Sequence, residues 1–286
     1  MNHHEVNLTV ELNSESFRQD EFEDKPAQRT KVRKHRRMSK NSLVSSFLND
    51  AVTKFYNYLI NYILPPRCLS CSEILNSKGE FCASCWGKLD FIAKPYCQLC
   101  GRKLAIAILD NFCCTRCYNN KPNYDLARSL LKFNEYSKKI IHQFKYQDKT
   151  VFAKTFAKLL YNRYGKEIAD IDLIVPVPMN RFKRLLRMYN PAHILAQEIA
   201  KITDKNIKAD ILIKAKWTKS QTFLSKKQRM NNIKKSIKFN KKHKITKQKI
   251  LLVDDVITTG TTIDECAKIL RRAGASSISV MTIAMT

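Results

Sequence analysis

The pattern of hydrophobic and polar positions changes along the chain, and its second half alternates between two periodicities. From Tyr124 onward, short apolar runs predict strands at 127–133, 173–177 and 250–253. Between them, apolar residues recur at helical spacing and predict helices at 136–146, 151–164, from Pro191 onward and at 263–273. Continuous apolar strands that alternate with helices are typical of a buried parallel sheet, so this part of the chain predicts an α/β domain.

The first part of the chain shows a different pattern. Residues 1–42 are polar, with acids early and a basic run later, and they predict a disordered tail. This tail could be a basic arm that touches nucleic acid, or an upstream extension with Met38 as the working start. Apolar positions at helical spacing then predict an amphipathic helix at 43–66, stopped by Pro65 and Pro66. We expect this helix to dock on its own domain or to lie at a membrane interface.

The predicted strand at 250–253 leads into a stretch that carries chemistry. Asp254 and Asp255 follow the strand, and a threonine-rich loop around Gly260 then opens a helix. Backbone N–H groups at a helix N-terminus suit a phosphate, and the threonine hydroxyls add donors. Two carboxylates would repel a phosphate but suit ribose hydroxyls or Mg²⁺, so the whole stretch suits a ribose 5-phosphate. The alternative is an ordinary helix N-cap with acids that favour the helix dipole.

A second loop follows the predicted strand at 173–177 and is basic. Such a loop suits a pyrophosphate through charge-assisted contacts, although it could also be only a solvated basic loop. The residues that we assign to this loop are Pro178, Met179, Asn180, Arg181 and Arg187.

The first residues lack the apolar core of a signal peptide, so we expect the ten cysteines to bind metal and not to form disulfides. Eight of them form four C-x-x-C pairs, and two such pairs can surround one tetrahedral Zn²⁺. We expect two structural zinc sites, because all-cysteine sites leave no open position for catalysis; a redox relay is the weaker alternative. The first site would use Cys68, Cys71, Cys82 and Cys85, and the second Cys97, Cys100, Cys114 and Cys117, which leaves Cys113 and Cys266 over.

The formal net charge of +27 predicts a polyanionic partner, nucleic acid before an anionic membrane surface, unless it reflects compositional drift. Lysines are frequent between Lys208 and Lys249, which could form a phosphate-backbone track or a flexible, solvated connection. The candidate nucleic-acid contacts are Lys226, Lys227, Arg229, Lys234 and Lys235. No apolar run is long enough to cross a membrane, so we expect a cytoplasmic protein, with the inner face of the membrane as the alternative location.

The stretch at 250–262 resembles the phosphoribosyl-pyrophosphate (PRPP) motif of type I phosphoribosyltransferases. That resemblance implies that the two acids contact the ribose and its transition state, that the loop binds the 5′-phosphate, and that Mg²⁺ accompanies PRPP. The PRPP-binding residues would be Asp254, Asp255, Val256, Thr258, Thr259, Gly260, Thr261 and Thr262. Purine-type members often have an aspartate base where Thr258 stands, so this chain offers no obvious general base.

The order of motifs is similar to the ComF (ComFC) family of competence proteins. A double zinc ribbon at 67–120 precedes F-K-Y-Q-D-K at 144–149, then V-P-V-P with R-L-L-R-M-Y-N-P-A, and W-T-K-S-Q-T-F-L-S-K-K-Q-R-M-N-N before the PRPP loop. The family often has R-G-F-N-Q where this chain has R-M-Y-N-P, so the resemblance implies the loop but not its exact geometry. The resemblance implies a type I phosphoribosyltransferase-like parallel sheet flanked by helices at 121–286, preceded by the small zinc-ribbon module.

The same resemblance implies a function: binding of PRPP or a related ribose phosphate, together with uptake or processing of single-stranded DNA in natural transformation. Two alternatives stay open. The chain could be an active phosphoribosyltransferase of unknown acceptor, or a zinc-ribbon adaptor that docks helicase or recombination proteins.

Overall fold

The computed structural model describes residues 65–78, 80–105, 112–146, 149–179, 189–214 and 236–286. The chain divides into two compact units, Met1–Phe55 and Tyr56–Thr286, and every described residue belongs to the second. The tail predicted at 1–42 and nearly all of the helix predicted at 43–66 therefore lie outside the described residues.

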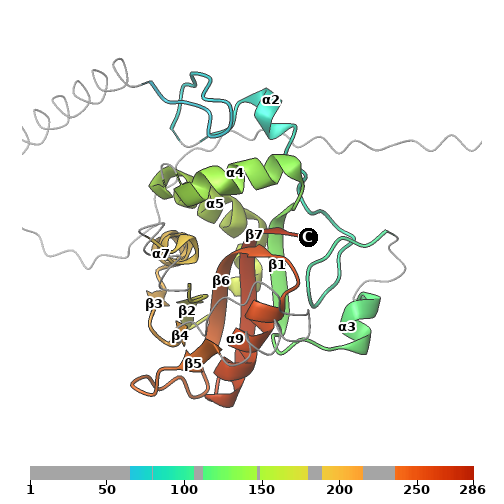
Figure 1. Cartoon of the computed structure of the whole chain (residues 1–286), viewed down its shortest axis with the longest axis vertical. Helices are drawn as coiled ribbons and strands as arrows, with labels where there is room; N and C mark the ends of the chain where they lie inside the picture. The colour runs from blue at the N-terminus through green and yellow to red at the C-terminus, as the bar shows by residue number, and fades with distance from the viewer. Residues whose placement is uncertain (1–64, 79, 106–111, 147–148, 180–188, 215–235) are drawn as a thin grey trace, which may run out of the picture. The chain divides into compact units, whose positions relative to one another are not determined.

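The centre of the second unit is a five-stranded sheet in the order β1-β7-β6-β2-β3 (Figure 1). All neighbouring strands run parallel, which confirms the predicted α/β class. In chain order the strands are β1 (Leu126–Lys132), β2 (Leu173–Pro176), β3 (Asn206–Ile207), β6 (Lys249–Ile257) and β7 (Ser277–Met285).

Strand β6 is longer than its apolar run predicts. The sequence places Asp254 and Asp255 after the strand, and this is wrong: β7 pairs with β6 through Asp254 and as far as Ile257. Hydrogen bonds to β7 keep the backbone of β6 extended beyond its apolar run, where the side chains become polar. Both acids therefore lie within β6, near its carboxyl end, and not in the loop that follows it.

Helices cover both faces of the sheet, as predicted. The described helices of this domain are α4 (Glu135–Tyr146), α5 (Lys149–Tyr164), the short 3₁₀ helix η1 (Gly165–Ile168), α7 (Pro191–Thr203) and α9 (Thr261–Arg272).

Alternate residues of β6 enter different cores because side chains along a strand point to opposite faces. Leu251 and Val253 pack in the core that α4, α5 and α7 close. Ile250 and Leu252 pack on the other face, in the core that α9 closes with Ile263 and its neighbours. The sheet is therefore buried on both sides, and its functional groups can emerge only at the strand ends.

Two further pieces are small. β4 (Leu212–Lys214) and β5 (Ile237–Phe239) form an antiparallel pair within the lysine-rich stretch at 208–249. The cysteine-rich module carries two short helices, α2 (Ala83–Trp86) and α3 (Thr115–Asn119). Among the described residues, no helix is both long and apolar enough to span a bilayer.

Candidate functional site

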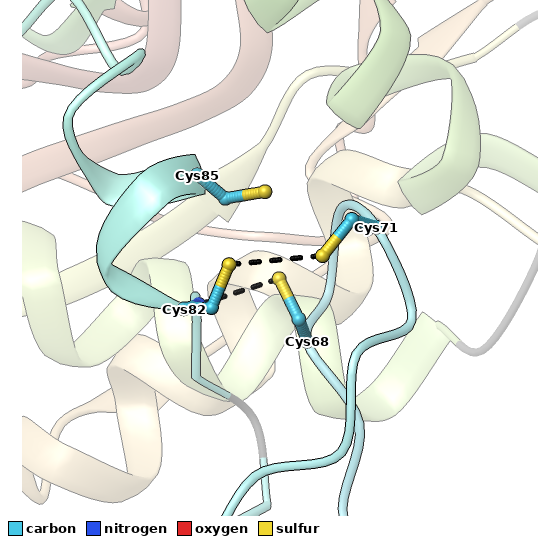
Figure 2. Close-up of side chains that lie close together, drawn as sticks. All are labelled: Cys68, Cys71, Cys82 and Cys85. Atoms are coloured by element: carbon cyan, nitrogen blue, oxygen red, sulfur yellow. Dashed lines mark hydrogen bonds between the residues drawn. The ribbon is translucent and has the colours of Figure 1, made fainter.

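The four cysteines of the first predicted zinc site converge. Figure 2 shows the thiols of Cys68, Cys71, Cys82 and Cys85 pointing toward one another, with Cys82 and Cys85 at the start and in the body of α2. The sulfur atoms of Cys71 and Cys82 are 3.7 Å apart, and the Cys82 N–H donates to the Cys68 sulfur at 3.3 Å. Backbone N–H donors of this kind stabilise a thiolate, which is the form that ligates a metal.

The second site repeats this geometry. Cys100 and Cys114 have their sulfur atoms 3.7 Å apart, and the Cys114 N–H donates to the Cys97 sulfur at 3.3 Å. In each group all four sulfur atoms lie within 4.8 Å of one another. A tetrahedral zinc with Zn–S bonds of about 2.3 Å requires sulfur–sulfur edges of about 3.8 Å, so both groups fit structural zinc. All ten cysteines lie among the described residues and none forms a disulfide; Cys113 and Cys266 belong to neither group.

The acid pair lies at the carboxyl end of β6, where parallel α/β sheets commonly bind ligands. Burial and, to a smaller extent, the neighbouring charge of Asp255 together raise the pKa of the Asp254 carboxyl to about 8. One Asp254 oxygen also accepts the Asp255 N–H at 2.9 Å. Asp254 is consequently mostly protonated at neutral pH, and it can donate as well as accept a hydrogen bond.

Asp255 has a partner that the sequence analysis did not identify. Lys145, at the end of α4, places its ammonium 2.8 Å from the Asp255 carboxylate, and both side chains are at least four-fifths buried. The carbonyl of the preceding residue, Phe144, accepts a hydrogen bond from the Tyr189 hydroxyl. Lys145 lies in the F-K-Y-Q-D-K segment, which was cited only as part of a resemblance; the structure gives this lysine a contact with the acid pair.

The threonine loop follows β6 directly. Gly260 has φ +73°, a left-handed conformation that glycine adopts without strain, and it caps the first turn of α9. Its carbonyl accepts the Asp264 N–H at 2.9 Å, while the hydroxyls of Thr259 and Thr261 lie 3.0 Å apart. Thr258 and Thr259 are exposed, and Thr261 and Thr262 are half-buried, so the loop presents hydroxyls and helix N–H groups at the surface. Val256 differs from them, because it packs partly against the core.

The strand beside β6 brings part of the second predicted loop to the same edge. Since β2 and β6 pair in parallel, Pro178 and Met179 leave the sheet next to the acid pair. Asn190 anchors the far end of this connection: its amide donates to the Val177 carbonyl at 3.0 Å, and its oxygen caps α7. The remaining predicted residues of the loop, Asn180, Arg181 and Arg187, lie outside the described residues.

The candidate nucleic-acid contacts cannot be placed in the same way. They all fall within 215–235, outside the part of the chain that the structure describes: Lys226, Lys227, Arg229, Lys234 and Lys235.

Two domain families match the chain in the order that the structure shows. A double zinc ribbon domain matches residues 59–118, and a phosphoribosyl transferase domain matches residues 145–285. The class is thus a phosphoribosyltransferase-type α/β domain that carries an N-terminal double zinc ribbon.

Comparison with whole proteins narrows this class to one family. The chain is 32% identical over 225 residues to competence protein F of Haemophilus influenzae, which covers 76% of this chain and 96% of the relative. It therefore belongs to the competence protein F family, which the sequence analysis predicted.

Two other matches are more distant. The DNA utilization protein YhgH of Escherichia coli is 26% identical over 198 residues, covering 68% of this chain and 85% of that protein. The crystal structure of a purine phosphoribosyltransferase from Pyrococcus horikoshii is 17% identical, covers 46% of this chain and 70% of the other, and has a TM-score of 0.29.

Proposed function

We propose that this protein binds PRPP, or a related ribose phosphate, as its Mg²⁺ complex at the end of β6, and that it acts on single-stranded DNA during natural transformation. One observation carries the first part of the proposal. The acids Asp254 and Asp255 and the glycine-capped start of α9 stand on one strand-to-helix connection of a phosphoribosyl transferase domain.

In this proposal each part of the connection meets one part of the ligand. The carboxyl groups of Asp254 and Asp255 accept hydrogen bonds from the ribose 2′ and 3′ hydroxyls. The loop at 258–262 and the N–H groups of α9 hold the 5′-phosphate, because a helix N-terminus favours an anion. The loop at 178–187, with Arg181 and Arg187, would hold the pyrophosphate. Mg²⁺, which prefers oxygen ligands, would arrive with the phosphates and supply positive charge between them.

Two observations support the DNA part of the proposal: the net charge of the chain and its similarity to named relatives. The net charge of +27 favours a polyanion, and the relatives are named as a competence protein and as a DNA utilization protein. The lysine-rich segment, including Lys226, Lys227 and Arg229, would follow the phosphate backbone of the strand. Helicase or recombination proteins would be the partners, at the cytoplasmic face of the membrane where DNA enters.

The domain limits predicted from the sequence complete the proposal. They comprise a tail at 1–42, a helix at 43–66, the zinc ribbons at 67–120 and the phosphoribosyltransferase-like domain at 121–286.

Calorimetric titration of PRPP with Mg²⁺ into the zinc-loaded protein tests the ligand. Asp254→Asn/Asp255→Asn should abolish saturable binding, while Asp172→Asn should not, because Asp172 accepts the Lys249 N–H at the opposite end of β6. Equal binding by all three proteins, or no binding by the wild type, would refute the ribose phosphate site.

Two further measurements separate the remaining functions. Salt-dependent binding of single-stranded oligonucleotides, weakened by neutralising Lys226 and Lys227, would support the DNA role, since phosphate contacts release counterions. Release of pyrophosphate on addition of an acceptor would instead assign group transfer: a bond forms between the acceptor nucleophile and C1′ of the ribose, and pyrophosphate leaves with the bonding electrons.

A further inference from the structure

The second zinc ribbon reaches the threonine loop through one arginine. Arg116 lies in α3, between the metal-ligating positions Cys114 and Cys117, and its guanidinium Nη2 donates a hydrogen bond to the Thr259 carbonyl. A Cβ atom built on Gly260 would lie 3.8 Å from the same nitrogen. The guanidinium thus stands over the loop, at the start of α9. Arg116 and Thr259 are both exposed, so a ligand on the loop would meet this cation.

Further contacts hold the second ribbon against the same part of the domain. The Asn123 backbone N–H and side-chain amide both donate to the Asp264 carboxylate, at 2.7 and 3.0 Å, and Asp264 lies in the first turn of α9. The Ala127 N–H in β1 donates to the Leu99 carbonyl of the ribbon at 2.7 Å. These contacts fix the ribbon on both sides of Arg116 in the sequence, so the arginine is held in place by more than its own hydrogen bond.

Gly101 shows how closely the ribbon approaches the sheet. Its φ is +72°, and a Cβ at this position would lie 2.4 Å from the Ala127 carbonyl oxygen, which is closer than real Cβ contacts come. The buried Arg128 of β1 adds a hydrogen bond to the Gln98 carbonyl at 3.0 Å and lies 4.8 Å from the centre of the Tyr96 ring. The second ribbon is therefore packed on β1 as part of the domain surface.

The first ribbon makes its contacts elsewhere. The Tyr136 hydroxyl of α4 donates to the Ser70 hydroxyl at 2.9 Å, and the ring of Phe81 lies 6.3 Å from that of Phe156 in α5. The hydrogen bonds of Ser70 run to Tyr136 and Gln143 in α4, and among the described residues none joins this ribbon to the loop at 258–262. The two zinc sites therefore differ in their relation to the proposed ligand site.

We propose that Arg116 is a positioning residue for the phosphate-binding loop, and that zinc in the second ribbon controls the affinity for phosphorylated ribose through it. This inference rests on the proposed function. A guanidinium that binds a loop carbonyl turns that carbonyl away from the phosphate and offers its remaining N–H groups to the phosphate oxygens. Zinc on Cys114 and Cys117 would fix the backbone on both sides of Arg116 and so keep the guanidinium over the loop.

Titration of the full-length protein with ribose 5-phosphate tests the arginine directly. Because a hydrogen bond to a charged group contributes about 1.5–3 kcal/mol, Arg116→Gln should weaken binding by about tenfold or more. Arg116→Lys should restore part of this loss, since it returns the charge but not the planar fork. The control is Lys121→Gln, which removes one positive charge from an exposed position close to the ribbon and should change the affinity less than about twofold. Equal affinity of Arg116→Gln and the wild type would overturn the proposal.

Amide hydrogen exchange at residues 258–262 tests positioning without a ligand. Arg116→Gln and the second-site variant Cys117→Ser should speed exchange in this loop, and the first-site variant Cys85→Ser and Lys121→Gln should not; zinc content identifies which site has been lost. Unchanged exchange in both Arg116→Gln and Cys117→Ser would refute the inference even if the wild type bound no ribose phosphate. Faster exchange together with no ligand binding would retain the positioning role and reject the proposed function.

Discussion

The ion pair between Lys145 and Asp255 permits a quantitative prediction about the acid pair. The two charged groups are 2.8 Å apart, and their side chains are 20% and 16% exposed. We expect Lys145→Met, which keeps the length of the side chain and removes its charge, to destabilise the protein more than Asp255→Asn does. The reason is that Lys145→Met leaves the largely buried Asp255 carboxylate without its ion-pair partner, whereas Asp255→Asn removes the buried negative charge itself.

The magnitude follows from the geometry. At an effective dielectric constant of about 20, two unit charges at this distance attract by roughly 6 kcal/mol, and desolvation of the two ions offsets most of that. Removal of one partner of a buried pair costs about 3–5 kcal/mol; for this slightly exposed pair we expect about 2–3 kcal/mol for Lys145→Met. Asp255→Asn should lower the free energy of unfolding by about 1 kcal/mol, because Asp254 can then ionise and form an ion pair with Lys145.

Urea denaturation at pH 7 of the wild type, both single variants and the double variant gives the coupling energy between the two side chains. We expect about 1.5 kcal/mol or more. Lys138→Met is the matched control, since Lys138 lies on the same helix in an exposed pair with Glu135 and should change stability by no more than about 0.5 kcal/mol. A coupling energy below about 0.5 kcal/mol, or equal effects of the two lysine substitutions, would refute this account of the pair.

Three further predictions concern the proton, the glycine and the metal. Between about pH 4 and pH 8 the folded protein keeps a proton on Asp254 that the unfolded chain has lost, so stability falls as pH rises through this window. Asp254→Asn should flatten that decline in a profile of Tm against pH; parallel profiles would contradict the raised pKa. Gly101→Ala should cost about 2 kcal/mol or more by chemical denaturation, because its Cβ would meet the Ala127 carbonyl at positive φ, whereas Gly87→Ala, with φ −62° and 3.6 Å of space, should have little effect. Metal analysis should find two zinc ions per chain and one in Cys85→Ser; one ion in the wild type would reject a filled pair of sites.

Much of the fold could be predicted because its elements are locally encoded. The helices α4, α5, α7 and α9 have apolar residues at helical spacing, and β2 is a short continuous apolar run. β7 was not predicted, although it lies between β1 and β6. Its hydroxyl residues make its sequence look less buried than it is: the hydroxyls of Thr282 and Ser129 hydrogen-bond across neighbouring strands at 2.7 Å. Such a partner is visible only once the strands have been paired.

The residues of the candidate site also differ in whether the sequence alone could identify them. The cysteine pairs, the acid pair and the glycine loop could be identified because each group lies within a few residues of sequence. Lys145 and Arg116 could not, because each meets the site from a distant part of the chain; Arg116 and Thr259 are 143 residues apart. Arg116 was also hidden by its position inside a C-x-x-C pair, where the cysteines alone account for the pattern.

Those two cations bear on how the proposed ribose phosphate site is compatible with a stable domain. Asp254 is held neutral by its raised pKa, Asp255 is paired with Lys145, and the Thr259 carbonyl accepts a hydrogen bond from Arg116. The polar groups that a ribose phosphate would meet therefore already have protein partners. In the proposed complex, Arg116 would keep its bond to the Thr259 carbonyl while its other N–H groups meet the phosphate, and the ligand would meet no bare charge, so binding would require less electrostatic reorganisation. The second zinc ribbon would thus be connected physically to the proposed site, because Arg116 belongs to that ribbon.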